Sequence, residues 1–271
     1  MTSGTATGRA SRARRSTATQ VAGRVGMACW GLVHLVVAYL AVRVASGDSG
    51  KEADQKGALQ EVGSSTAGQA VLWVLALGLV AFGVWQFLMA AGGYQWRTDK
   101  GARIRNRLGS AARGLMVLVL AYTAIRIATG SGSASGNQPQ QELSARLLRL
   151  PAGQALVAAA GAVVVVVGVA AAVKGIKRSF RQDLDLPLRG GTWVEWLGSA
   201  GYVAKGVVYV IIGGLLGYAA LRSDAGQAGG VDKALRTLAA QPYGVVLLVI
   251  VAAGLAAFGV YSFAAARAHK S

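Results

Sequence analysis

Charged residues and cysteines are scarce in this sequence. Asp, Glu, Lys and Arg make up only 14% of its 271 residues, against about a quarter in an ordinary soluble domain. Cys29 is the single cysteine, which excludes an intramolecular disulfide framework and a thiolate cluster for zinc or iron–sulfur. Because 54% of the residues are hydrophobic and 38 are glycine, the composition indicates a membrane protein.

Catalytic and nucleotide-binding motifs are missing as well. The sequence contains neither G-x-S-x-G nor G-x-x-x-x-G-K-[ST], the signatures of a serine hydrolase and of a phosphate loop. Its long apolar runs contain no Asp or Glu, which removes acid–base pairs and carboxylate metal ligands from those runs. We therefore predict a protein that is not an enzyme and has no metal site and no cofactor.

Long charge-free runs are what the sequence offers in their place. A helix needs about 20 apolar residues to cross a membrane, and five runs meet this length: 25–42, 62–96, 150–173, 206–221 and 237–266. A sixth, 108–128, carries Arg113 and Arg126, whose long side chains can reach the headgroups. The first run is too long for the core of a signal sequence. We predict six spanning helices near 25–46, 69–92, 108–129, 152–174, 200–221 and 243–265.

The basic residues lie mostly on one side of these predicted helices. The two tails and the second and fourth connections hold 17 Lys and Arg, whereas the first, third and fifth connections hold seven. This asymmetry predicts a bacterial plasma-membrane protein with both termini in the cytoplasm. It also explains the net charge of +17 by topology and by attraction to anionic headgroups at the cytoplasmic face, rather than by nucleic-acid binding.

An internal repeat is the strongest signal in the sequence. GLVHLVVAYLAVR, from Gly31, returns as GLMVLVLAYTAIR, from Gly114, with eight of 13 letters unchanged. Glycines then define three two-helix units, in which the first and last glycines are 57, 59 and 58 residues apart. The glycines that we expect to pack the helices are Gly26, Gly31, Gly83, Gly109, Gly114, Gly168, Gly201, Gly206 and Gly259.

The third unit resembles a known family most closely. GYVAKGVVYVIIGG, followed by ALRTLAAQPYGVVLLVIVAAGLAAFGVYSF, is similar to the repeat of the domain of unknown function 1206 family of actinobacterial membrane proteins. The first two units diverge from it, with MACWGLVH and SAARGLMV in place of GYVAKGVVY. The resemblance covers about residues 21–270 and implies a fold and a membrane location. It implies no activity.

These observations predict an all-α integral membrane protein with three parallel two-helix repeats, closed into a pseudo-threefold bundle. We divide the chain into a basic disordered cytoplasmic tail, 1–20, and repeat units at 21–93, 104–177 and 193–270. Units that enter the membrane in the same direction can be related only by an axis along the membrane normal. Small residues should let the helices approach, and the pairs Gly213/Gly217 and Ala158/Ala162 are candidates for this contact.

Polar residues inside the spans are the candidate functional site, because charge is costly to keep in a membrane. Spacings of four residues place His34 on one helix face, Arg113 at an equivalent position on the next odd helix, and Lys205 with Tyr209 on the last. We predict that these four form a basic, hydrogen-bonding ring. The competing interpretation makes Arg113 and Lys205 anchors near the cytoplasmic headgroups and His34 a packed neutral imidazole.

Two functions remain open from the sequence. The first is a non-catalytic protein that organises lipids, a protein partner or further copies of itself. The second is a small transporter or channel for an anionic or neutral solute, which would use the predicted ring. Coupled cation transport normally leaves an acidic residue within the spans, and none is present. This absence favours the first function without removing anion conduction.

Overall fold

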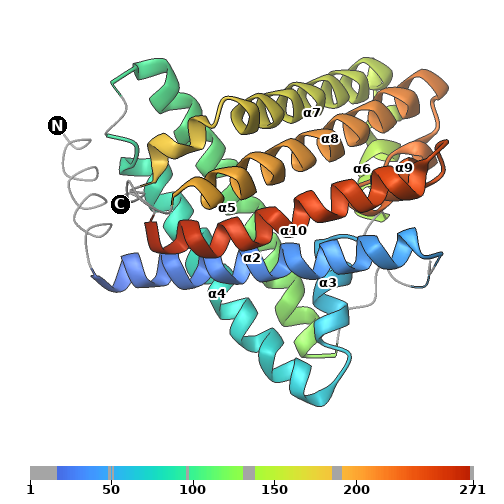
Figure 1. The fold of residues 1–271 in the computed structure, drawn as a ribbon. Coiled ribbons are helices and arrows are strands. Elements are labelled where there is room, and N and C mark those ends of the chain that lie inside the picture. The colour runs from blue at the N-terminus through green and yellow to red at the C-terminus, as the bar shows by residue number, and fades with distance from the viewer. Residues whose placement is uncertain are drawn as a thin grey trace. The chain divides into compact units, whose positions relative to one another are not determined.

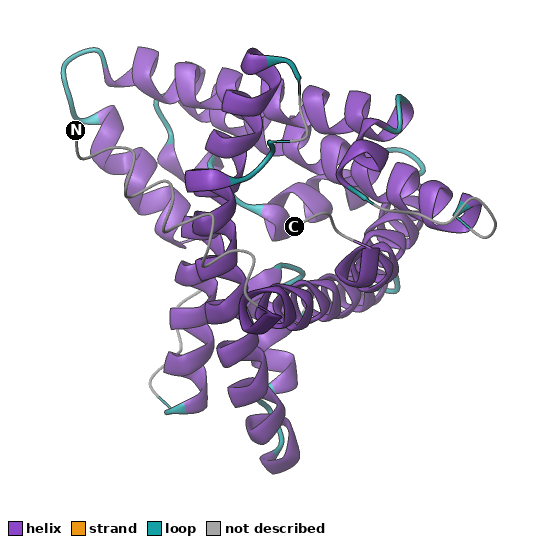
Figure 2. Ribbon diagram, turned by 90° about the vertical axis from the view of Figure 1, so that its left-hand side faces the viewer, coloured by secondary structure: helices purple, strands orange, loops and turns teal. Residues whose placement is uncertain are grey.

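The protein is described here by a computed structural model, which defines residues 17–47, 50, 52–95, 98–130, 138–184 and 191–268. Residues 1–16 of the predicted tail lie outside this described part. Helices make up most of the described chain (Figure 2). An all-α fold is what a bilayer demands, because a helix satisfies its backbone hydrogen bonds within one segment.

Six helices are long and apolar enough to cross a membrane among the described residues, which confirms the predicted number. They are α2 (Thr17–Ala45), α4 (Thr66–Gly92), α5 (Lys100–Ala128), α7 (Gly153–Ile176), α8 (Thr192–Arg222) and α10 (Gly244–Ala268). Helices α5 and α8 begin eight residues before the predicted spans. Asp99 accepts hydrogen bonds from the Gly101 and Ala102 N–H groups and so starts α5 within its polar segment. Hydropathy locates the apolar part of a helix and not its polar extension.

Short helices occupy the first, third and fifth connections, where the sequence shows an amphipathic turn before each even-numbered span. These are α3 (Gln55–Val62), α6 (Gln138–Leu148) and α9 (Val231–Ala239). Two turns of 3₁₀ helix, η1 (Ser179–Asp183) and η2 (Ala225–Gln227), complete the described elements.

The chain forms two compact units. The first contains Met1–Leu32, Val62–Gly132 and Ser262–Ser271, and the second contains Val33–Glu61 and Ser133–Tyr261. Helices α2 and α10 therefore contribute to both units. Within the first unit α4 packs against α5, and within the second α7 packs against α8, along which it runs side by side (Figure 1).

Glycines hold these helix pairs together, and they do so in the same way in both units. A methyl group added at Gly168 would lie 2.9 Å from the Gly206 carbonyl oxygen, so α7 and α8 touch through their backbones. The equivalent pair is Gly83 and Gly114 in α4 and α5, where a methyl at Gly83 would lie 3.4 Å from the Gly114 carbonyl oxygen. Each repeat thus joins the next at the same two glycines.

The first glycine of the odd helices has a different role, because it packs helices within one repeat. A methyl at Gly26 in α2 would lie 2.6 Å from the Gly78 carbonyl oxygen of α4, and one at Gly201 in α8 would lie 2.5 Å from Cβ of Phe258 in α10. The second repeat differs, since Gly109 is exposed and a methyl there would meet no atom within 4 Å. Gly31 and Gly259 are buried.

The small-residue pairs named from the sequence are only partly used. Gly213 contacts Gly161 closely, but Gly217 has open space around it, and Ala158 and Ala162 are exposed. The seam on α7 is instead formed by Gly161, Gly168 and Gly175, one every seven residues. A seven-residue repeat keeps one narrow stripe of a helix facing its neighbour, whereas the alanine pair lies on another face. The pseudo-threefold closure of the bundle stays a prediction.

Candidate functional site

A buried histidine, a lysine and a phenylalanine form the most unusual polar contact inside the candidate spans. Lys205 Nζ lies 3.4 Å from His34 Nε2 and 4.0 Å from the centre of the Phe258 ring. The rings of His34 and Phe258 are 4.9 Å apart. An ammonium group can donate a hydrogen bond to a neutral imidazole and is also attracted to the face of an aromatic ring. We call His34, Lys205 and Phe258 the histidine–lysine cluster.

The histidine–lysine cluster lies near the middle of three long helices. His34 is 13 residues from the start of the span Val21–Ala45 and is only 2% exposed. Lys205 is 13 residues after the start of α8 and is half-buried, about 20 Å along the helix axis. Sequence reasoning placed Lys205 one turn inside the end of its span. The lysine instead lies deeper in its helix and points towards other helices.

Tyr209 and Arg113, the other members of the predicted ring, are placed differently. Tyr209 packs towards α7, where its Cβ would lie 3.0 Å from a methyl at Gly168. Positions four apart turn by about 40° around a helix, and here this rotation is enough to send Lys205 and Tyr209 towards different neighbours. Arg113 belongs to the first unit and is exposed. The four-residue ring stays a prediction, of which the His34–Lys205 pair is the part in contact within one unit.

Aromatic side chains continue from the histidine–lysine cluster to the start of α8. The Tyr202 ring lies 5.5 Å from Phe258 and 5.4 Å from Phe180 of η1. Lys174 lies over the other ring contact of this chain, 5.0 Å from the centre of Tyr202, and forms an ion pair of 3.6 Å with Asp183. These stacked rings fix the orientation of Phe258, because edge and stacked ring pairs have preferred geometries.

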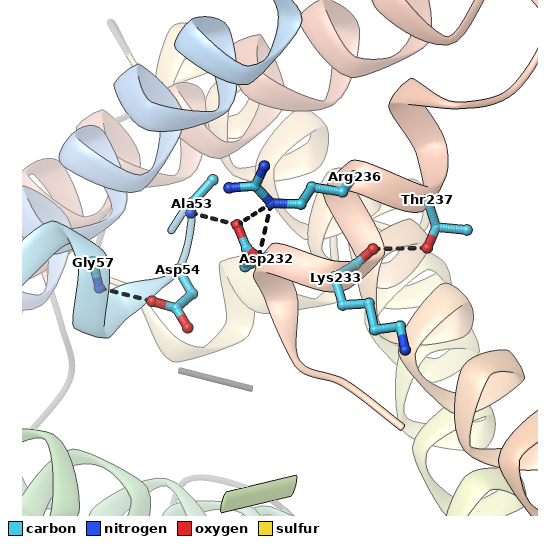
Figure 3. A network of polar contacts seen from close by, with 7 residues as sticks. All are labelled: Ala53, Asp54, Gly57, Asp232, Lys233, Arg236 and Thr237. Carbon is cyan, nitrogen blue, oxygen red and sulfur yellow. Dashed lines mark hydrogen bonds and ion pairs between the residues drawn. The ribbon is translucent and has the colours of Figure 1, made fainter. Parts of the chain in front are cut away.

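A second polar cluster joins the first and fifth connections (Figure 3). The Ala53 N–H donates to Asp232 Oδ1 over 2.8 Å, and Arg236 Nε donates to both oxygens of the same carboxylate. Asp54 caps α3 by accepting a 2.7 Å hydrogen bond from the Gly57 N–H. Through Asp232, α9 is therefore tied to the segment that begins α3, its counterpart in the first repeat.

Asp54 is a strongly perturbed carboxyl group outside the candidate spans. Burial raises the pKa of Asp54 from 3.8 to about 6, because a charged carboxylate is poorly solvated there. The hydrogen bond from Gly57 lowers the pKa, and the negative charges of Glu52 and Asp232 raise it further. Its side chain is only 6% exposed. Within the described residues, no three His, Cys, Asp or Glu side chains are arranged to hold a metal ion.

Comparison with known proteins places these contacts in a family. The sequence profile of the domain of unknown function DUF1206 matches three segments, 25–93, 108–178 and 200–269, which together span most of the chain. The protein belongs to the DUF1206 family. The three matched segments correspond to the three repeats, each contributing one odd-numbered and one even-numbered span.

One curated relative shows how far this similarity extends. The chain is 29% identical over 243 residues to the "Uncharacterized protein YxxB" of Bacillus subtilis (strain 168), which covers 89% of this chain and 87% of that protein. No solved structure matches. The relative therefore shares the repeat architecture over nearly its whole length and brings no activity with it.

Superposing the three DUF1206 repeats also identifies a polar residue that sequence reasoning missed. Gln86 in α4 corresponds to Ala171 and Ser262 in the other even helices. It is 1% exposed, and neither its Nε2 nor its Oε1 has a hydrogen-bond partner among the described residues. Burial without partners costs an amide about 1–3 kcal/mol. Since α7 uses alanine at this place, the helix packing of the family does not require an amide.

Sequence reasoning also missed the Asp54–Asp232 cluster, because the connections were treated only by their charge. A signal was present in both cases. Asp54 stands directly before an amphipathic turn, which is a helix-capping position, and Gln86 interrupts an otherwise apolar run. The contact between His34 and Lys205 left no such signal, because the two residues are 171 positions apart.

The pKa of Asp54 predicts a pH dependence of stability. A carboxyl group with a pKa of about 6 in the folded protein and 3.8 when unfolded holds its proton more tightly when folded, so stability should rise as the pH falls from about 6 to 4. The difference is on the order of 3 kcal/mol. Asp54→Asn keeps the cap and should remove this dependence, making the variant more stable than wild type at pH 7.5. Thermal melting of the purified protein between pH 4 and 7.5 measures it.

Asp224→Asn is the matched control for this prediction. Asp224 caps η2 and is exposed, and the pKa of its carboxyl group is lowered, mainly by the hydrogen bond from the Gln227 side chain. Its replacement should therefore leave the stabilisation of acidified protein in place. Equal pH profiles for wild type and Asp54→Asn would show that Asp54 does not titrate in this range.

Proposed function

We propose that the protein binds a small anionic solute at the histidine–lysine cluster and lets it cross the membrane. The observation that carries this proposal is the position of Lys205, which lies near the middle of its helix and turns towards His34 and Phe258 instead of reaching for the headgroups. A cation near the centre of a span costs about 2.5–3.5 kcal/mol, and neither helix packing nor anchoring requires it.

The chemistry of the cluster suits an anion. Lys205 supplies a positive charge, and His34 supplies a ring nitrogen that donates or accepts according to its tautomer. Phe258 contributes a ring against which the ammonium rests and provides an apolar wall. Passage of a solute needs no bond-breaking, so the proposal makes the protein non-catalytic.

The direction of the chain in the membrane is part of the proposal. Both termini would lie in the cytoplasm of a bacterial cell, with the α3, α6 and α9 side outside. Support comes from the distribution of basic residues, 17 on the side of the termini against seven on the other. The anionic headgroups of the cytoplasmic leaflet would then face the exposed basic residues of the second and fourth connections.

Reporter fusions test this orientation. Fusions after Gly93 and Asp183, which follow α4 and α7, should be active as cytoplasmic reporters. Fusions after Gly47 and Gly130, which follow α2 and α5, should be active as external reporters. The reverse pattern at all four sites would invert the protein, and an external signal after Gly93 would mean that α2 and α4 do not cross the membrane as a pair.

Lys205→Met tests the anion site, because methionine keeps the length of the side chain and removes its charge. In proteoliposomes, wild-type protein should carry chloride, nitrate or phosphate above the level of protein-free vesicles, and Lys205→Met should lower this flux at least about tenfold. The variant should melt no lower than wild type, since an apolar side chain replaces a buried charge. Lys233→Met, in the exposed polar connection, is the control that should leave the flux unchanged.

Two results would contradict the anion site. Wild-type vesicles that conduct none of these ions faster than empty vesicles would leave the cluster without a transported anion. Equal flux through wild type and Lys205→Met would mean that ions cross elsewhere. Lys205→Arg keeps the charge and should retain more flux than the methionine variant.

A second candidate function is the organisation of lipids or of a protein partner, including a second copy of the chain. It is favoured by the α7 surface away from the glycine seam, where Val163, Val166 and Val167 are 51–66% exposed. It is also favoured by Trp196, which is 62% exposed and lies under the guanidinium of Arg178 at 4.4 Å, a combination typical of the membrane interface. Absence of anion flux would leave this candidate.

A further inference from the structure

The same aromatic and basic pair closes each of the three odd-numbered spans. Helices α2, α5 and α8 each carry a tyrosine followed four residues later by an arginine in the last turn. In each pair the guanidinium carbon lies 5.5–6.0 Å from the centre of the tyrosine ring. The pairs are Tyr39 and Arg43, Tyr122 and Arg126, and Tyr218 and Arg222.

The local structure explains how each pair is held. Residues four apart lie one above the other on a helix, so the arginine rests over the ring of the tyrosine. A positive charge is also favoured in the last turn, where the helix presents unpaired carbonyl groups. The tyrosines are 45–60% exposed. Their rings therefore lie at the surface of the helix ends, and each guanidinium retains an outward face.

The third pair shows that its position follows the end of the helix. Tyr39 and Tyr122 lie 13 residues after the first glycines of their repeats, Gly26 and Gly109, but Tyr218 lies 17 residues after Gly201. Helix α8 is thus one turn longer in this part, and the pair has moved by one turn to remain at its end. Contacts between helices follow the glycine count, whereas a membrane boundary is met at the helix end. The pairs are therefore matched to the boundary.

We propose that the three tyrosine–arginine pairs are binding sites for phospholipid headgroup phosphates of one leaflet, one site in each repeat. Parallel repeats bring the ends of all odd-numbered spans to the same side of the membrane, so one leaflet serves all three. A guanidinium binds phosphate oxygens in a bidentate manner, and tyrosine rings favour the depth of the headgroups. Anionic phospholipids match the charge of the three sites.

The three sites differ in one respect. Arg43 Nη1 lies 3.8 Å from Glu61 Oε1, and a carboxylate competes with a phosphate for the same guanidinium. The Tyr39–Arg43 site therefore binds a phosphate more weakly than the other two, and Glu61→Gln strengthens it. This inference concerns lipid binding at the helix ends and does not depend on an anion at Lys205.

Native mass spectrometry of the delipidated protein with phosphatidylglycerol tests the sites. Wild type should bind three phosphatidylglycerol molecules more strongly than any further ones, and each single variant, Arg43→Gln, Arg126→Gln or Arg222→Gln, should lose one of them with about a fivefold lower affinity. Diacylglycerol, which lacks the phosphate, should show no such preference. Tyr122→Phe keeps the ring and should bind as wild type, whereas Tyr122→Leu should bind less.

Two controls make the test decisive. The variant Arg105→Gln/Lys177→Gln/Arg267→Gln removes three exposed charges elsewhere on the chain and should keep the three tight lipids. A triple Arg→Lys variant of the sites keeps the charge and should fall between wild type and the triple Gln variant, even if the latter folds poorly. Equal phosphatidylglycerol binding by wild type and the Arg→Gln variants would overturn the proposal, as would equal loss in the control variant.

Discussion

Close contact between helix backbones at glycines is the interaction on which the rest of this structure depends. Lipid tails are as apolar as leucine, so helices in a bilayer gain little from burying leucine and valine against one another. They gain from dispersion contacts and must therefore approach closely. At Gly168 and Gly206, and again at Gly161 and Gly213, α7 and α8 come so near that a methyl group would meet a backbone oxygen. The same arrangement recurs at Gly83 and Gly114.

This packing also explains how a lysine is accommodated among apolar helices. Gly201 lets α10 approach α8 so closely that the Phe258 backbone contacts the glycine. One turn further along α8, Lys205 then finds the face of the Phe258 ring and, beyond it, the imidazole of His34. The first repeat uses the same crossing, with Gly26 against α4 near Phe82, but carries Trp30 where the third carries Lys205. One helix crossing thus supports an aromatic contact in one repeat and a charged contact in another.

The sequence predicted those features that repeat and missed those that arise from a single contact. Hydropathy located six spans and the glycine spacing located the helix seams, because both depend on patterns within one segment. The face of α8 that carries Lys205 could be drawn from the sequence, but not the neighbour that each residue of that face would meet. Lys205 and Tyr209 diverge because a small rotation of the helix decides between α10 and α7. The link between Ala53 and Asp232 likewise depends on how distant connections meet.

Two neighbouring glycines of α8 test the central role of backbone contact most directly. A methyl at Gly213 would lie 2.6 Å from the Gly161 carbonyl oxygen, whereas one at Gly214 would meet no atom within 4 Å. Gly213→Ala should lower the free energy of unfolding in lipid nanodiscs by about 1–3 kcal/mol through overpacking. Gly214→Ala should leave it unchanged or raise it slightly, because alanine favours the helix. Equal stability of the two variants would contradict the view that glycine contacts hold these helices together.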